Sequence, residues 1–200
     1  MITDNEKKVL KYIMVYSSSY PSINKIAKDT NLSPNGAYKI LKKFEAEKII
    51  NYRQISNIKS YYINYEKAKN MLELALTEKI TDKKIMYRID DLSKLQLLTK
   101  SCILFGSYIK GKENPNDLDV LYIIEKTKFS EFKEKLVNIK EISPVKIHDI
   151  IQSEQDLTSN IKKKEKALLD AIFTGKTIWG QKTIVKAFSN ADKVTFIFNA

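Results

Sequence analysis

Residues 105–123, FGSYIKGKENPNDLDVLYI, contain the pattern that predicts the fold of the second half of the chain. An apolar run precedes Gly106-Ser107, and a polar loop separates this pair from Asp117-Leu118-Asp119 and a second apolar run. Short apolar runs bounded by glycine and polar residues are typical of buried strands. Because Asp117 and Asp119 are two residues apart, a strand would point both carboxylates to the same face. The pattern predicts two strands with a pair of acids beside a glycine-containing turn.

The rest of the second half alternates between strand-like and helix-like segments. The β-rich or apolar runs predict strands at 102–105, 118–124 and 145–151, an edge at 178–180 and a last strand that carries Val194, Phe196 and Phe198. The apolar periodicity predicts helices at 129–138, at 154–174 before Gly175, and at 181–189. This half is therefore expected to be a mixed sheet with flanking helices.

The first 65 residues have the order helix, helix, turn, helix, hairpin. Residues 5–17 have a helical apolar stripe, and Ser22 and Ser33 are suited to cap the next two helices, the latter with Pro34 at its first position. Two short β-rich runs follow, at 49–53 and 60–63, around a polar tip at 56–57. Two further helices are expected in residues 65–100, with a break near 81–82. We therefore predict an α+β protein with a first domain at 1–65, a helical connector at 66–100 and a second domain at 101–200.

The composition excludes several classes of protein. No apolar run reaches the length of about 18–20 residues that a membrane span needs, and the N-terminus lacks the layout of a signal peptide. The single cysteine, Cys102, excludes an internal disulfide and a multi-cysteine zinc site, and the single histidine, His148, excludes a two-histidine metal motif. We expect a cytoplasmic protein without a membrane partner, in which carboxylates would hold any metal ion.

The chain is strongly basic, with a formal net charge of +11. The excess is densest in residues 1–65, which hold 11 basic and 5 acidic residues. A basic surface favours phosphate-containing partners, nucleic acid first. A lysine-rich coding bias would explain the overall excess equally well, but it does not explain the asymmetry along the chain.

Residues 22–53, SINKIAKDTNLSPNGAYKILKKFEAEKIINYR, resemble a winged helix-turn-helix of bacterial and archaeal regulators. The resemblance implies that the third helix contacts DNA, which is consistent with its inward apolar stripe and its outward polar residues. Asparagine and lysine side chains reach base edges, and lysines also meet phosphates. The expected DNA-binding residues are Asn35, Tyr38, Lys39, Lys42, Lys43, Arg53 and Lys59. The alternatives are a trihelical interaction domain with an ordinary solvated lysine face, or a domain that binds RNA or protein.

The stretch from Phe105 to Ile123 resembles the nucleotidyltransferase superfamily of the DNA polymerase β type, and most closely its minimal members. The resemblance implies that Gly106, Ser107 and Lys110 approach nucleotide phosphates, and that Asp117 and Asp119 hold Mg²⁺ or Mn²⁺.

A third catalytic acid, which also binds metal, normally comes from a neighbouring strand in this superfamily, and Asp149 is the candidate. Since Val145 and Ile147 on its side are apolar, the strand has the alternative of presenting His148 to the site instead.

Two functions fit these resemblances. The first is an Mg²⁺-dependent enzyme that transfers a nucleoside monophosphate from an NTP to a hydroxyl group of a nucleic acid, a protein or a small molecule. The resemblance implies a protein partner as one such acceptor, since small relatives act in toxin–antitoxin pairs. The second is a DNA-binding transcription regulator whose nucleotidyltransferase-like domain senses nucleotide or forms a dimer. The regulator predicts a homodimer with recognition helices about 34 Å apart. An RNA-modifying enzyme with an RNA-clamping winged helix is a third alternative.

Overall fold

The computed structural model describes residues 2–111, 115 and 117–195, and it divides the chain into two compact units, Met1–Leu76 and Thr77–Ala200. The residues that we expected to form a connector, 66–100, are shared between these units. Helix α4 (Tyr65–Leu76) packs against α1 (Asp4–Tyr16) in the first unit. Helix α5 (Lys83–Ser93) contributes Ile85 and Leu92 to the core of the second unit. Each of these two helices belongs to the unit whose core its apolar stripe enters.

The first unit is built on three helices, α1, α2 (Ile23–Thr30) and α3 (Pro34–Ala46), with a 3₁₀ turn at Ser17–Ser19 after α1. Ser22 and Ser33 cap α2 and α3 through their side chains, as predicted, and Pro34 stands in the first turn of α3. Asn31 ends α2 in a left-handed conformation with φ 57°. The short turn between α2 and α3 is therefore specified by local capping residues.

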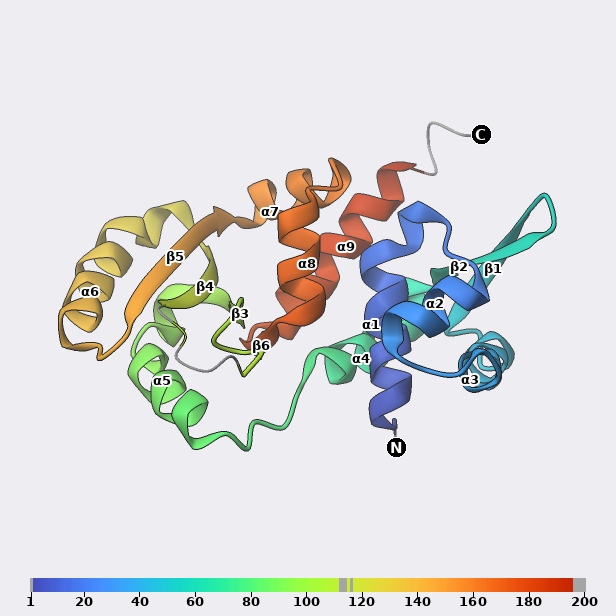
Figure 1. The fold of residues 1–200 in the computed structure, drawn as a ribbon. Helices are drawn as coiled ribbons and strands as arrows, with labels where there is room; N and C mark the ends of the chain where they lie inside the picture. The colour runs from blue at the N-terminus through green and yellow to red at the C-terminus, as the bar shows by residue number, and fades with distance from the viewer. Residues whose placement is uncertain (1, 112–114, 116, 196–200) are drawn as a thin grey trace. The chain divides into compact units, whose positions relative to one another are not determined.

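A two-stranded antiparallel hairpin, β1 (Ile50–Ile55) and β2 (Ile58–Ile63), follows α3. Its tip projects away from the three helices (Figure 1), with Ser56 at φ 51° in the turn. The base of the hairpin is buried through Ile50, Tyr61 and Ile63, whereas most of β1 is exposed. The predicted order of helix, helix, turn, helix and hairpin is confirmed.

The second unit contains a four-stranded mixed sheet in the order β5-β4-β3-β6. Strand β3 pairs antiparallel with both β4 and β6, and β4 pairs parallel with β5. The elements of this unit after α5 are a 3₁₀ turn at Gln96–Leu98, β3 (Thr99–Phe105), β4 (Asp117–Ile124), a 3₁₀ turn at Lys126–Lys128, α6 (Phe129–Ile142), β5 (Lys146–Ser153), α7 (Glu154–Lys162), α8 (Lys166–Thr174), β6 (Lys176–Trp179) and α9 (Gln181–Thr195).

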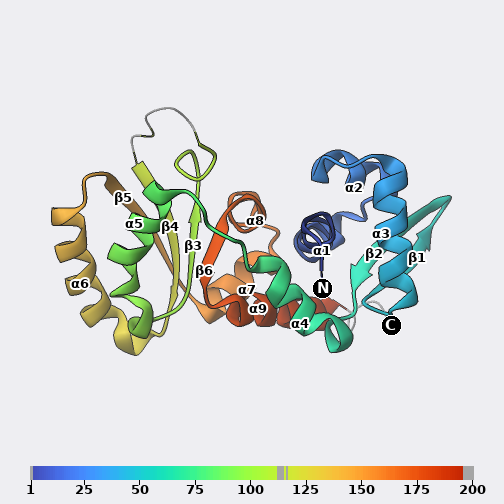
Figure 2. The same cartoon turned by 90° about the horizontal axis from the view of Figure 1, so that it is seen from below.

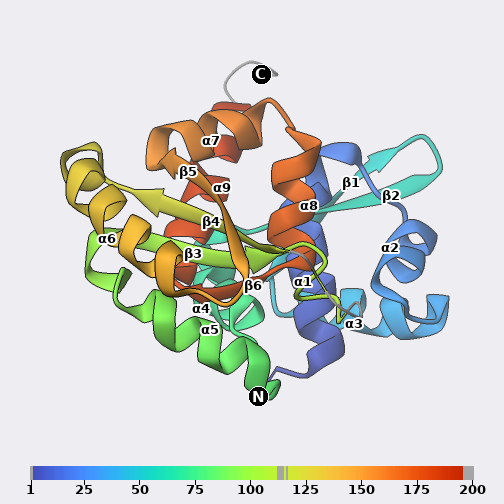
Figure 3. The ribbon, with the colours of Figure 1, turned by 60° about the vertical axis from the view of Figure 1, so that its left-hand side comes forward.

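Helices cover both faces of this sheet. One face packs against α5 and α6, where the ring of Tyr122 meets Phe132 edge-on at a centroid distance of 5.0 Å. Helices α8 and α9 contact β3, and α7 contacts β4 and β5. Figure 2 shows the strands between these two sets of helices, and in Figure 3 the sheet lies between α5 and α7. Hence the α+β prediction, with N-terminal helices before a mixed sheet with flanking helices, is confirmed.

Two predicted elements of the second unit are wrong. The helix expected at 154–174 is two helices. The first ends because Lys164 adopts the left-handed conformation, with φ 58°, and the Glu165 N–H donates a hydrogen bond back to the Asn160 carbonyl. Val194 belongs to α9 rather than to a last strand. Phe196 and Phe198 lie outside the described residues.

Candidate functional site

The outward face of α3 carries the polar residues that were expected to meet DNA. Asn35, Tyr38, Lys39 and Lys42 are all exposed, and they recur at helical spacing along one face. The opposite face is buried through the apolar residues Ala37, Leu41 and Phe44. The amphipathic division that the sequence indicated is confirmed, and it leaves a polar ridge available to a partner.

A hollow of about 480 Å³ lies beside this ridge. It is bounded by the starts of α2 and α3 and by the hairpin tip, and its lining residues are Ser22, Ile23, Asn24, Pro34, Asn35, Tyr38, Asn57, Ile58 and Lys59. Helix N-termini favour anions because their first N–H groups point outward. The hollow therefore combines two helix starts, a lysine and several hydrogen-bonding side chains on one surface of the first unit.

Arg53 and Lys59, the two expected DNA-binding cations of the hairpin, lie against aromatic rings. The Arg53 guanidinium lies 4.8 Å from the ring centroid of Tyr20 and 5.2 Å from that of Tyr62. The Lys59 ammonium lies 3.7 Å above the ring of Tyr52. Such contacts orient a cation without neutralising its charge. Sequence reasoning did not single out these tyrosines, because nothing in their spacing shows that they meet the two cations.

Lys43, which we predicted to contact a phosphate, forms an ion pair within the first unit. Its ammonium lies 2.7 Å from Oε1 of Glu6, whose side chain is only 8% exposed. Burial raises the pKa of Glu6, but hydrogen bonds from Lys43 and Thr3 outweigh this effect and the net pKa is lowered. The ion pair fastens α3 to α1, so Lys43 is already engaged within the fold.

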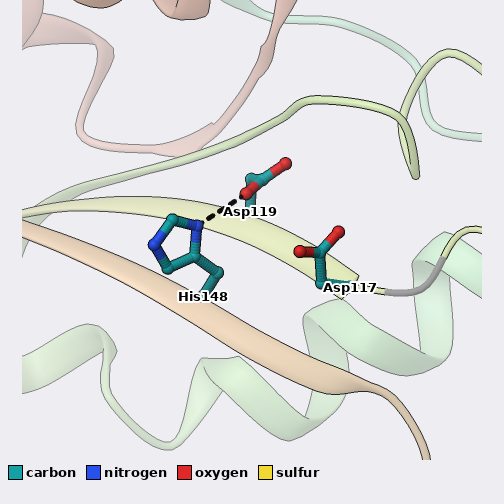
Figure 4. A group of neighbouring side chains, drawn as sticks. All are labelled: Asp117, Asp119 and His148. Atoms are coloured by element: carbon teal, nitrogen blue, oxygen red, sulfur yellow. Dashed lines mark hydrogen bonds and ion pairs between the residues drawn. The ribbon is translucent and has the colours of Figure 1, made fainter.

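The second candidate site lies where β3 ends and β4 begins. Asp117 and Asp119 are on β4, and in the sheet register Asp119 stands between Phe105 of β3 and His148 of β5. Figure 4 shows the side chains of Asp117, Asp119 and His148 on the same side of the sheet, with a hydrogen bond between Asp119 and His148. One ligand atom from each of the three residues lies within 4.8 Å of the other two.

Gly106 brings backbone directly to this cluster. It directly follows β3 with φ 79°, and a Cβ atom at this position would overlap the Oδ2 atom of Asp119. Only glycine permits both the conformation and the approach. Ser107 and Lys110 continue the same turn, with Ser107 half-buried and Lys110 exposed. The structure therefore brings Gly106 against Asp119, with the other two predicted phosphate ligands following in the turn.

Asp149 is not part of the cluster, which corrects its predicted position as the third acid. Adjacent residues of a strand point to opposite faces, so β5 presents His148 to the acids and Asp149 to α6. The Asp149 carboxylate forms ion pairs with Lys140 and, at 3.1 Å, with Lys133. Burial raises the pKa of Asp149, but these two hydrogen bonds outweigh it and hold the net pKa below its usual value. The alternative in which His148 faces the site is the observed arrangement.

The three side chains of the cluster are chemically suited to a divalent cation. Two carboxylates and one imidazole nitrogen are all ligands of first-row divalent metals. The side chain of Asp119 is 19% exposed and that of His148 is 62% exposed, so the site opens to solvent on one side. An open position beside three protein ligands is the arrangement of metal sites that bind a further molecule.

Each half of the chain matches the model of a known family. Residues 80–193, more than half of the chain, match the model of a family of unknown function, DUF6932. The chain belongs to this family. The match covers most of the second unit, including the sheet and the Asp117–Asp119–His148 cluster, and the description of the family names no activity.

Residues 2–50 match the model of a helix-turn-helix domain. This segment contains α1, α2 and α3 and ends at the first residue of β1. The match identifies a helix-turn-helix domain in the first unit and supports DNA binding by it. No curated protein and no solved structure matches the chain significantly. None of the helices in the described part of the chain has the length and apolar character needed to cross a membrane.

Proposed function

We propose that this protein is a DNA-binding transcription regulator that uses the exposed face of α3. The observation that carries the proposal is the polar ridge of Asn35, Tyr38, Lys39 and Lys42 on a helix whose other face is buried. In helix-turn-helix proteins the second helix of the motif lies in the major groove and its first residues contact base edges. Asn35, in the first turn of α3, is the residue suited to read a base, and Tyr38 and Lys39 follow it.

The hairpin supplies the second contact with DNA in this proposal. In it, Arg53, whose guanidinium lies against two tyrosine rings, and Lys59, at the rim of the hollow, would contact the phosphate backbone. Phosphate contacts position a protein on the duplex, whereas contacts with base edges give sequence preference. The hairpin would thus contribute affinity and α3 would contribute specificity.

Glu45 places a negative charge beside two lysines of this binding surface. Its carboxylate lies 3.2 Å from the ammonium of Lys42 and 3.7 Å from that of Lys59. Exposed ion pairs of this kind contribute little to stability, so DNA phosphates can replace the carboxylate as partner. Glu45 therefore weakens affinity for DNA, because its negative charge would lie close to the phosphates.

Fluorescence anisotropy with labelled 30-base-pair duplexes, over a series of salt concentrations, tests the proposal. We expect Lys39→Ala to lower affinity about 3- to 10-fold and to reduce the salt slope by about one. Glu45→Gln should raise affinity about 2- to 5-fold. Lys135→Ala is the matched control, because Lys135 is an exposed lysine of α6 that pairs with Glu131. Absence of duplex binding, or equal effects of Lys39→Ala and Lys135→Ala, would overturn the proposal.

A second candidate function is favoured by the approach of Gly106 to Asp119. In it, Asp117 and Asp119 hold a divalent cation, and Gly106, Ser107 and Lys110 approach the phosphates of a nucleoside triphosphate. A bound cation would neutralise charge on those phosphates. The resemblance to minimal nucleotidyltransferases supports transfer of a nucleoside monophosphate to an acceptor hydroxyl, with loss of pyrophosphate.

This second proposal is tested with α-labelled NTPs and Mg²⁺ or Mn²⁺. Label that appears on the protein itself, on RNA, on DNA or on a lysate protein would identify an active transferase and its acceptor class. The label should be lost in the Asp117→Ala/Asp119→Ala variant. NTP binding that shifts DNA affinity without transfer supports a nucleotide sensor within a regulator. Absence of both NTP binding and transfer would reject the second proposal and leave the DNA-binding proposal standing.

A further inference from the structure

We propose that His148 is a metal ligand, and that it makes the cluster of Asp117, Asp119 and His148 select a first-row transition metal such as Mn²⁺ over Mg²⁺. The inference deepens the second proposal above, on which it rests for the presence of a cation between the carboxylates. It is independent of DNA binding. It also differs from the carboxylate-only metal site that the sequence indicated.

The spacing of the donor atoms supports this proposal. The Nδ1 atom of His148 lies 3.0 Å from Oδ1 of Asp119. Two neighbouring ligand atoms, each about 2.1 Å from one octahedral metal ion, are themselves about 3.0 Å apart. A cation can therefore replace the hydrogen bond between these two atoms with almost no movement of β4 or β5. Asp117 needs only a side-chain rotation, since its ligand atom is already within 4.8 Å of the other two.

The backbone brings these three residues together on one face of the sheet, whatever their side-chain conformations. Asp119 and His148 are paired residues in the register of β4 and β5, and Asp117 is two residues before Asp119 on the same face. The Oδ2 atom of Asp119, which is not bonded to His148, lies against the backbone of Gly106, because glycine has no side chain there. Asp117 and Asp119 thus come from the inner strand β4, and His148 comes from the edge strand β5, where its side chain is 62% exposed. This is the geometry of a rigid site with free coordination positions.

The donor set determines the preferred metal. Mg²⁺ prefers a shell made of oxygen atoms and near-ideal octahedral geometry, so an imidazole ligand brings it little advantage. First-row transition metals bind imidazole nitrogen well, and their affinities for a nitrogen–oxygen site rise from Mn²⁺ through Co²⁺. Replacing the usual third carboxylate by His148 also leaves the site with one negative charge fewer. This lowers its attraction for any divalent cation, and the imidazole nitrogen compensates for the loss better with a transition metal than with Mg²⁺.

Metal titration of the full chain without nucleotide tests the proposal. We expect the dissociation constant for Mn²⁺ to be at least about tenfold lower than that for Mg²⁺. His148→Ala should raise the Mn²⁺ constant about tenfold or more and change the Mg²⁺ constant less than about threefold. His148→Asp should restore a third carboxylate, strengthen Mg²⁺ binding and so reduce the preference for Mn²⁺. Ile150→Ala, which shortens an exposed side chain on the same face of β5, is the control and should change neither constant.

Pulsed electron paramagnetic resonance of bound Mn²⁺ gives a readout that does not depend on activity. Modulation from a directly coordinated imidazole nitrogen is expected in the natural protein and in Ile150→Ala, and it should be absent in His148→Ala. Circular dichroism of each variant checks the fold. Mn²⁺ that binds without a nitrogen signal, or a Mn²⁺ preference that is undiminished in His148→Ala, would overturn the proposal and leave His148 as a hydrogen-bond partner of Asp119.

The outcomes also separate this inference from the second proposed function. Mn²⁺ binding through His148 together with a failure to bind any NTP would support the inference and reject the nucleotide proposal. NTP binding whose metal preference does not depend on His148 would do the reverse. Unchanged metal binding in Asp117→Asn/Asp119→Asn would overturn this inference, because the cluster would then not be the metal site.

Discussion

Gly106 lies directly against the carboxylate of Asp119, so that a Cβ atom on Gly106 would overlap Oδ2 of that residue. Gly106 directly follows β3, at the start of the polar loop, and Asp119 is the third residue of β4, just after that loop. Because of this contact, a larger side chain at position 106 would displace the carboxylate of Asp119. A substitution of Gly106 should therefore alter the acid cluster.

The first prediction is that Gly106→Ala disables the acid cluster. The new methyl group must displace Asp119, and alanine is strained at φ 79°, so we expect a loss of about 1 to 3 kcal/mol in stability and weaker metal binding. Gly111→Ala is the matched control, because Gly111 also has a positive φ, 68°, but a Cβ there meets no atom of the described residues within 4 Å. It should cost about 1 kcal/mol and leave metal binding intact. Equal metal affinities in the two variants would show that the contact is unimportant.

The second prediction concerns Asp149 and acid stability. Its pKa is lowered in the folded state, so its ion pairs contribute stability above the unfolded pKa of about 3.9 and lose it as the pH falls further. Asp149→Asn should lower the free energy of unfolding by about 1 to 2 kcal/mol at pH 7. The difference from the natural protein should shrink as the pH falls from about 5 towards 3. Urea unfolding at several pH values measures it, and a pH-independent difference would contradict the assignment.

The third prediction separates the two kinds of lysine on α3. Lys43→Ala should lower the midpoint of thermal unfolding, because it leaves Glu6 buried without its cation, and it should change DNA affinity little. Lys39→Ala should show the opposite pattern, with DNA affinity reduced and thermal stability retained. Thermal melts and anisotropy titrations on the same samples make the comparison. A large loss of DNA affinity in Lys43→Ala, without loss of stability, would show that Lys43 contacts DNA.

The fourth prediction is that the aromatic rings position Arg53. Tyr62→Leu removes one of the two rings that hold the guanidinium and keeps the charge, so we expect DNA affinity to fall about 2- to 3-fold. Arg53→Ala should reduce affinity about 3- to 10-fold and lower the salt slope by about one, whereas Tyr62→Leu should leave the slope unchanged. Anisotropy titrations at three salt concentrations distinguish these effects. Identical slopes in both variants would show that Arg53 makes no phosphate contact.

Local chemistry made most of the first unit predictable from the sequence. Ser22, Ser33 and Pro34 act within a few residues of their own positions, so the starts of α2 and α3 could be placed without knowledge of any long-range contact. The exposed face of α3 followed from helical periodicity for the same reason. The pairing of Lys43 with Glu6 could not be foreseen, because it joins residues 37 positions apart across two helices.

In the second unit the sequence alone determined that Asp117 and Asp119 share one face of a strand beside a Gly-Ser turn, since strand alternation and loop order are local properties. It left open whether Asp149 or His148 faces that pair. Only the tertiary structure decided this, because α6 packs on one face of β5 and brings Lys133 and Lys140 to Asp149. The parallel register of β5 with β4 then sets His148 beside Asp119. The apolar residues Val145 and Ile147 favoured this facing, but Asp149 lies on their side of the strand. Its burial there depends on lysines of α6, whose position no local pattern shows.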